Sequence, residues 1–198
     1  VAVRGFDMSK ASSLTNSPSQ YGWISIAFHW SLAIGVIGLF AVGAWMVDLD
    51  YYSNWYHEAP FWHKSVGVIV VGAMVLRWAW NHVSKTPKTY AGVESAWAQY
   101  AIKAMHASLY VLVVLIGISG YLISTAEDQG IMVFNWFEVP ALFPAFENQA
   151  DIMGDVHEWL ANALIALVTL HFVGALKHHF WDKDNTLLRM LKPQKNVP

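Results

Sequence analysis

Four long apolar runs, separated by polar connections, dominate the chain. They cover residues 24–47, 61–80, 104–124 and 156–176. A helix needs about 20 residues, at about 1.5 Å each, to cross a hydrocarbon core of about 30 Å, so each run is long enough to span a membrane. The run 24–47 contains no Asp, Glu, Lys or Arg, which argues against a soluble bundle with apolar core helices. The pattern predicts an all-α membrane protein with a four-transmembrane-helix bundle.

Composition supports a membrane protein and narrows its chemistry. Of the 198 residues 56% are hydrophobic and 13% are charged, whereas soluble domains carry roughly 25% charged residues. The chain has no cysteine, which excludes disulfides, thioether-attached haem and cysteine-ligated iron–sulfur clusters. Any metal must therefore be held by histidine or carboxylate side chains. The net charge of -2 gives no sign of a nucleic-acid partner.

Lysine and arginine are distributed unevenly among the connections, and short positive loops stay in the cytoplasm. Lys64 is the only one of the 12 basic residues on its side of the predicted bundle. The other side holds Arg4, Lys10, Arg77, Lys85, Lys88, Lys103, Lys177, Lys183, Arg189, Lys192 and Lys195. We therefore expect both termini to be cytoplasmic, with the protein in a plasma membrane.

The chain divides into a leader at 1–20, a four-helix domain at 21–192 and a tail at 193–198. The leader is polar, so we expect it to be disordered and to contain no cleavable signal peptide. The outer stretch 135–149, NWFEVPALFPAFENQ, is too short to span a membrane and is interrupted by two prolines. Its aromatic residues predict either a segment in the membrane interface or an ordered lid on the helix ends.

Histidines occur at matching depths within the apolar runs. On an ideal helix His157 and His171 share a face and stand about 21 Å apart along the axis. His63 lies at the depth of His157 near the outer side, and His29 lies at the depth of His171 near the inner side. Because ionisable groups inside a membrane are costly and usually functional, the two pairs are candidate metal-ligand sites.

Haem b suits such pairs better than a bare zinc or copper ion. A bare ion would draw on carboxylate or sulfur ligands at the same depth, and the sequence offers no such cluster. Haem b needs only two axial imidazoles, and an iron without an open position suits electron transfer rather than oxygen binding. Glycines on the helix faces allow a flat ring to approach, although close helix packing explains any single one equally well. They are Gly35, Gly38, Gly43, Gly67, Gly72, Gly117 and Gly120.

Six stretches resemble the bacterial cytochrome b561 family, whose better-studied members act as superoxide oxidases. The stretches are ISIAFHW, WHKSVG, MHASLYVLVVLIGISG, VHEWLAN, TLHF and, in the tail, HHFWDKDNTLLRM. The resemblance covers 21–192 and implies two haems b. According to this resemblance, His29 and His171 ligate the inner haem iron, and His63 and His157 ligate the outer haem iron. The family is also similar to the cytochrome subunits of formate dehydrogenases and hydrogenases.

The resemblance also implies a ubiquinone site on the cytoplasmic side. His106 and His178 fall at the matching places, and each has a side chain that can donate a hydrogen bond to a carbonyl oxygen. Trp181 is a candidate wall of this site, and Lys85 or Lys88 a candidate source of charge. A solvated interfacial residue is an equally good interpretation of His178.

The predicted function is that of a transmembrane di-haem cytochrome that moves electrons from a periplasmic donor to ubiquinone. The resemblance implies that the donor is superoxide. The outer connections are acidic, so attraction of this anion has to be local, at Lys64 with help from His57. Arg77 and Lys64 are also candidate partners for haem propionates, although the positive-inside rule explains Arg77 equally well.

Two other functions stay open. A cytochrome b anchor that carries electrons for a larger dehydrogenase or hydrogenase complex predicts co-purifying subunits. A histidine-lined metal transporter predicts a polar path between the two histidine levels, and the stretch 160–169 offers little beyond Asn162 and Thr169.

Overall fold

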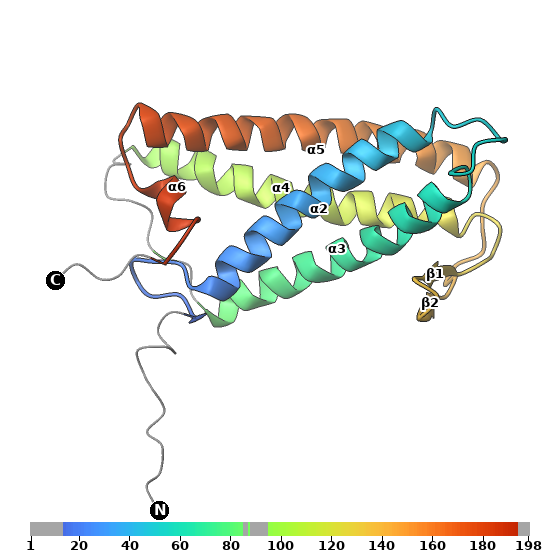
Figure 1. The fold of residues 1–198 in the computed structure, drawn as a ribbon, viewed down its shortest axis with the longest axis horizontal. Coiled ribbons are helices and arrows are strands. Elements are labelled where there is room, and N and C mark those ends of the chain that lie inside the picture. Colours follow the sequence, from blue (N-terminus) through green and yellow to red (C-terminus); the bar gives the residue numbers. More distant parts are fainter. Residues whose placement is uncertain (1–13, 85–86, 88–94, 194–198) are drawn as a thin grey trace, which may run out of the picture.

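Four long helices dominate the computed structural model, which describes residues 14–84, 87 and 95–193 (Figure 1). The elements are α2 (Trp23–Met46), α3 (Glu58–Val83), α4 (Ala96–Ser124), β1 (Ile131–Val133), β2 (Phe137–Val139), α5 (Gln149–Phe180) and α6 (Thr186–Arg189). The helices α2, α3, α4 and α5 are each long and apolar enough to cross a membrane. The predicted four-helix transmembrane bundle is therefore confirmed.

The helices extend beyond the apolar runs that predict them. The helix α5 begins at Gln149 rather than at residue 156, and α4 begins at Ala96 rather than at residue 104. Helical backbone hydrogen bonds form equally well between polar residues, so a helix continues where its apolar run ends. Hydropathy alone therefore locates the membrane-spanning part of each helix and misses the turns outside it.

The bundle consists of two helical hairpins. The helix α2 packs chiefly on α3, and α4 packs chiefly on α5. In Figure 1, α2 runs obliquely across the bundle and α5 lies along α4. The described chain begins and ends at one end of the bundle, where α6 also lies, and we call this the terminal end. The strands β1 and β2 lie at the other end, which we call the strand end.

One apolar layer joins all four long helices at mid-height. Its buried residues are Leu32, Val70, Met74, Val113 and Leu164. Each lies between the two histidine levels of its own helix or of its neighbour. This layer holds the two hairpins together between the histidine pairs.

Two glycines bring α3 close to its neighbours. A Cβ atom added at Gly35 of α2 would lie 2.9 Å from Val70 Cγ2, and one added at Gly117 of α4 would lie 2.7 Å from Val71 Cγ2. Contacts this short are not tolerated between carbon atoms, so any side chain at either position would push the helices apart. Close helix packing is therefore the role of these two glycines.

Asn16 anchors the start of the described chain to the end of α3. Its backbone N–H donates to Ser84 Oγ at 3.0 Å and its Nδ2 donates to the Ser84 carbonyl at 2.9 Å. Its Oδ1 accepts from Ser25 Oγ at 2.8 Å and from the Gly22 N–H at 2.9 Å. Asn16, in the stretch 14–20 for which we expected disorder, is thus fixed by its backbone N–H and by a side chain that bonds to three other residues. The rest of the expected leader, 1–13, lies outside the described residues.

The tail folds back onto α2 at the terminal end. Trp30 Nε1 donates a hydrogen bond to the Met190 carbonyl at 2.7 Å. The guanidinium carbon of Arg189 lies 5.7 Å from the centre of the Tyr21 ring, within the range of a cation–π interaction. The segment that follows α5 is therefore part of the folded domain up to this point.

A small hairpin closes the strand end. The strands β1 and β2 are antiparallel, with Met132 opposite Glu138. The Phe134 N–H donates to the fully buried Ser65 Oγ of α3 at 3.1 Å. The Tyr121 hydroxyl of α4 donates to the Pro140 carbonyl at 2.9 Å. These bonds support the ordered-lid alternative, and the lid presents exposed apolar side chains outward, among them Trp136, Leu142 and Phe143.

Candidate functional site: two pairs of histidines

The structure brings four of the candidate histidines together in two pairs. His29 of α2 and His171 of α5 lie near the terminal end, with ring centres 6.2 Å apart. His63 of α3 and His157 of α5 lie near the strand end, and their ring centres are also 6.2 Å apart. We call the first the inner pair and the second the outer pair, after the sides that the sequence predicts for them. Both pairs join α5 to the first hairpin. The helix α5 is therefore the common support of the two sites.

The separation within each pair fits two imidazoles on one metal ion. An imidazole nitrogen binds a first-row metal ion at about 2.0 Å, and the ring centre lies roughly 1.1 Å behind it, so two facing rings stand about 6.2 Å apart. Both observed separations are 6.2 Å. The residues present therefore fit a group that takes two axial imidazoles, such as haem b.

The outer pair has further features of a ligand site. His157 Nδ1 lies 3.1 Å from the Ile116 carbonyl and 3.0 Å from Ser119 Oγ. A ring that donates from Nδ1 to a carbonyl leaves Nε2 as its metal-binding nitrogen, as is usual for histidine ligands. His63 Nδ1 is buried and has no hydrogen-bond partner among the described residues. Such a nitrogen is costly to bury unless a further group binds this ring.

Two glycines pack against the rings of the outer pair. A Cβ atom added at Gly43 would lie 3.1 Å from His63 Cε1, and one added at Gly120 would lie 3.1 Å from His157 Cε1. Each glycine thus makes room for a histidine rather than for a cofactor. A Cβ atom added at Gly38, Gly67 or Gly72 would meet no atom of a described residue within 4 Å. These three open positions are compatible with a flat ring between the helices.

Arg77 contacts the inner pair. Its Nη2 donates a hydrogen bond to His29 Nδ1 at 3.0 Å, so a neutral His29 ring carries its proton on Nε2 in this arrangement. A ring that binds metal through Nε2 must instead carry that proton on Nδ1. The two arrangements exclude each other, so metal binding through His29 Nε2 requires Arg77 to turn away. An Arg77 released in this way is available to an anion such as a haem propionate.

His106 lies beside the inner pair rather than apart from it. Its ring centre is 5.2 Å from that of His171, and its Nδ1 donates to the Ile102 carbonyl at 2.7 Å. Two rings on opposite sides of one metal ion stand about 6.2 Å apart, so 5.2 Å is too short for His106 and His171 to be the two axial ligands of one haem. Of the two neighbours of His171, His29 is therefore the better partner.

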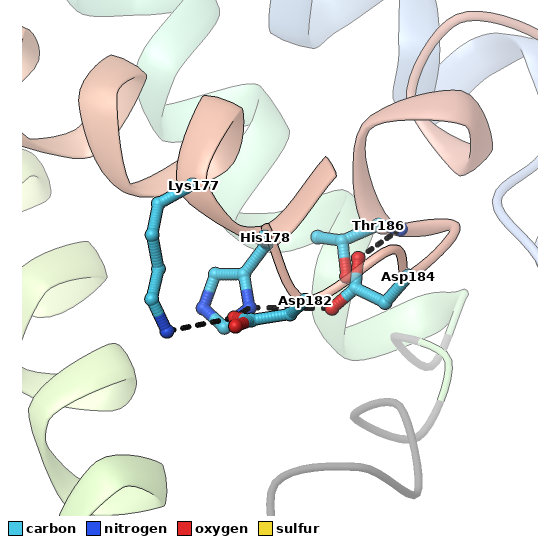
Figure 2. Close-up of polar contacts among 5 residues, drawn as sticks. All are labelled: Lys177, His178, Asp182, Asp184 and Thr186. Atoms are coloured by element: carbon cyan, nitrogen blue, oxygen red, sulfur yellow. Dashed lines mark hydrogen bonds and ion pairs between the residues drawn. The ribbon is translucent and has the colours of Figure 1, made fainter. Parts of the chain in front are cut away.

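The other candidate quinone residues lie further towards the terminal end. His178 faces Asp182 and Asp184, as Figure 2 shows. Trp181 follows the end of α5 and is 83% exposed, so its ring is accessible from the surroundings. Lys85 and Lys88 lie outside the described residues. The two carboxylates beside His178 were not identified from the sequence; Asp182 is its i+4 neighbour, whereas Asp184 reaches it only because the chain reverses at Lys183.

Lys64 and His57 share a hollow at the strand end. The hollow is open, has a volume of about 610 Å³, and is walled mainly by apolar and aromatic side chains. Its other lining residues are Met46, Val47, Leu49, Tyr56, Pro60 and Phe61. Lys64 follows the candidate ligand His63 directly in α3. The two side chains expected to attract an anion thus line one hollow, with Lys64 directly after His63 and His57 six residues before it.

Within the described ranges, no group of three or more histidine, aspartate or glutamate side chains is arranged to hold a metal ion. A path for bare zinc or copper normally provides such groups. A group that needs only two imidazoles does not require such a cluster.

Comparison with known proteins identifies the family. The model of the family described as prokaryotic cytochrome b561 matches residues 20–193. Cytochrome b561 homolog 2 of Escherichia coli (strain K12) is 50% identical over 179 residues, 90% of this chain and 95% of that protein. Cytochrome b561 homolog 1 of the same organism is 29% identical over 133 residues, 67% of this chain and 74% of that protein. The probable superoxide oxidase CybB of Yersinia pestis is 34% identical over 90 residues, 46% of this chain and 50% of that protein.

The family match covers all four membrane-spanning helices and the folded part of the tail. It agrees with the resemblance seen in the sequence, and with a multi-pass bacterial membrane protein. The chain therefore belongs to the prokaryotic cytochrome b561 family, a family of membrane cytochromes that bind haem b.

Proposed function

We propose that the protein binds two haems b and passes electrons across the membrane, from a donor outside the cell membrane to ubiquinone at the cytoplasmic side. The observation that carries this proposal is the presence of two histidine pairs with the same ring separation at opposite ends of the bundle. In this proposal the terminal end faces the cytoplasm, as the distribution of Lys and Arg predicts.

The chain's own residues would hold the two cofactors. His29 and His171 would ligate the inner haem, and His63 and His157 the outer one. Haem b supplies one-electron oxidation and reduction when bound, without an open position for oxygen. Ser119 and the Ile116 carbonyl would hold the outer ligand in the correct tautomer.

We propose superoxide as the outer donor. The name of the Yersinia pestis relative supports this choice, although the similarity covers 46% of the chain. The hollow at Lys64 and His57 supports it physically, because a local positive charge attracts an anion to a surface that is otherwise acidic. Lys64 would attract the anion, and the apolar walls beside it would limit its hydration.

The proposed acceptor is ubiquinone at the terminal end. Two superoxide ions lose one electron each and leave as oxygen, and these two electrons with two cytoplasmic protons convert one ubiquinone to ubiquinol. His178 and Trp181 lie at this end and are accessible in part. His106 lies beside the inner histidine pair, with its ring centre 5.2 Å from that of His171.

The proposal is tested by two measurements on the detergent-purified protein. A pyridine haemochrome assay should give two b haems per chain. A pulse of superoxide with a short-chain ubiquinone present should reduce haem and form quinol. If neither haem is reduced and no quinol forms, superoxide is not the donor.

The anchor-subunit alternative makes a different prediction in the same preparation. An anchor would purify with further subunits under mild conditions, and it would be reduced only when they are present. Reduction of the isolated chain by superoxide would therefore exclude a role limited to that of an anchor.

A further inference from the structure

The turn after α5 brings two carboxylates to one nitrogen of His178. His178 Nδ1 lies 2.9 Å from Asp182 Oδ2 and 3.2 Å from Asp184 Oδ2. Figure 2 shows both carboxylates on the same side of the ring. The His178 side chain is 26% exposed and Asp184 is 10% exposed, whereas Asp182 is 30% exposed. The cluster thus reaches from a mostly buried carboxylate to the solvent.

The backbone of the turn fixes this arrangement. The Asp184 N–H donates to the His178 carbonyl at 3.0 Å, and Asp184 Oδ1 accepts from the Thr186 N–H at 2.8 Å. Lys183 has a left-handed conformation with φ 54°, which reverses the chain between the two aspartates. Asp184 is therefore held against the ring by its own main chain and by the start of α6.

The position of the carboxylates determines which nitrogen of His178 exchanges protons. Both contacts have ion-pair distances without hydrogen-bond geometry, and because carboxylates only accept hydrogen bonds, a proton on Nδ1 is the arrangement that they favour. The second nitrogen, Nε2, is then the atom that gains and loses a proton. An aspartate behind the ring of a general acid or base has this effect in many enzymes.

A lysine also contacts the cluster. Lys177 Nζ lies 2.8 Å from Asp182 Oδ2 and compensates the charge of that carboxylate, whereas the ion pair of Asp184 is with His178. The hydrogen bond from Lys177 lowers the pKa of Asp182, so that carboxylate stays charged. On the elements packed beside α5, Arg189 of α6 lies over Tyr21 and His106 of α4 lies beside His171.

We propose that Asp182 and Asp184 hold His178 as the proton donor for the quinone that is reduced at this end of the bundle. This inference rests on the proposed function. Conversion of ubiquinone to quinol adds two electrons and two protons to its two carbonyl oxygens. Each proton moves from His178 Nε2 to a quinone oxygen, and a proton from the cytoplasm then rebinds Nε2, while Nδ1 keeps its proton towards the two carboxylates. In this relay Asp182 and Asp184 are positioning residues, because they act through His178.

The test measures reoxidation of the reduced holoprotein by two acceptors. The haems are reduced with dithionite under anaerobic conditions, and the protein is mixed with ubiquinone-1 or with ferricyanide while the haem absorbance is followed. Ferricyanide accepts an electron without a proton, so it serves as the control acceptor. The variants are Asp184→Asn, Asp182→Asn and, as a matched control in the same turn, Lys183→Asn, since asparagine tolerates a left-handed backbone.

We expect Asp184→Asn to slow reoxidation by ubiquinone-1 by about 10-fold or more, since general acid catalysis contributes about 100- to 10,000-fold. Asp182→Asn should have a smaller effect in the same direction. In both variants the pH above which the rate declines should move to a lower value. Reoxidation by ferricyanide, the haem content and the Lys183→Asn variant should be unchanged.

The outcomes separate this inference from the function on which it rests. If ubiquinone-1 fails to reoxidise the wild-type protein, the proposed acceptor is wrong, and the relay is wrong with it. Normal wild-type reoxidation with unchanged rates and pH profiles in both aspartate variants overturns the relay alone. If a variant slows reoxidation by ubiquinone-1 and by ferricyanide equally, the carboxylates have a structural role, and this outcome also overturns the relay.

Discussion

Replacement of Gly120 by alanine should weaken the binding of the outer haem without destabilising the fold. The new methyl carbon would lie 3.1 Å from His157 Cε1, whereas ordinary carbon contacts begin at about 3.4 Å. The ring must therefore move by about 0.3 Å. The Ile116 carbonyl and Ser119 Oγ hold His157 at 3.1 and 3.0 Å, so this shift stretches the bonds that orient the ligand.

The magnitude follows from the cost of overpacking, about 1–3 kcal/mol. If haem loss relieves this strain, the affinity for the outer haem falls by about 5- to 150-fold, because each 1.4 kcal/mol is about a factor of 10. The same change removes a glycine from the interior of α4, which stabilises a helix by roughly 0.5–1 kcal/mol. Haem affinity and stability of the haem-free protein should therefore change in opposite directions.

The assay is a transfer experiment with apomyoglobin as the haem acceptor, in which the rates of loss from the two sites are resolved by absorbance. Gly120→Ala should accelerate the loss of one haem only. Gly154→Ala serves as a control on α5, because a Cβ atom there meets no described atom within 4 Å. Equal retention of both haems by Gly120→Ala would contradict the contact between this glycine and a ligand ring, and loss of both would point to general unfolding.

Three further predictions concern single sites. His157→Ala should remove the outer haem and His171→Ala the inner one, each lowering the pyridine haemochrome from two haems per chain to one; loss of both in either variant would contradict independent sites. Lys64→Glu should slow reduction by superoxide by about 10-fold, while the wild-type rate depends only weakly on salt in stopped-flow measurements. Lys177 lowers the pKa of Asp182 in the folded protein, so this carboxylate adds stability above its unfolded value of 3.8, and the contribution is lost as the pH falls through that value and below. The unfolding temperature of wild type should thus fall more on acidification than that of Lys177→Gln, and equal slopes would exclude this coupling.

The sequence contains most of the information about the bundle. Apolar runs of sufficient length predict the four spans, because the thickness of the membrane requires them. Helical geometry places His157 and His171 on one face of one helix, and counting along the other helices gives each a neighbour at its depth. The structure places the members of each pair 6.2 Å apart, and haem ligation by them stays a prediction.

Contacts between distant residues and reversals of the chain were not predictable in the same way. Asn16 and Ser84 bond to each other across 68 positions, and no periodicity marks such a pair. The three-residue strands β1 and β2 are too short to show alternation. The contact of Asp184 with His178 depends on one left-handed residue, Lys183, which composition does not reveal.

The apolar layer at mid-height has an electrical consequence. It is built from Leu32, Val70, Met74, Val113 and Leu164, and none of these side chains carries or relays a proton. In the proposed reaction each electron would therefore cross the middle of the membrane without a compensating positive charge. Inward movement of one negative charge against an inside-negative membrane potential costs about 2.3 kcal/mol per 100 mV over the full membrane. The membrane potential of the cell would thus slow the reaction, and the protein would reduce ubiquinone fastest where that potential is low.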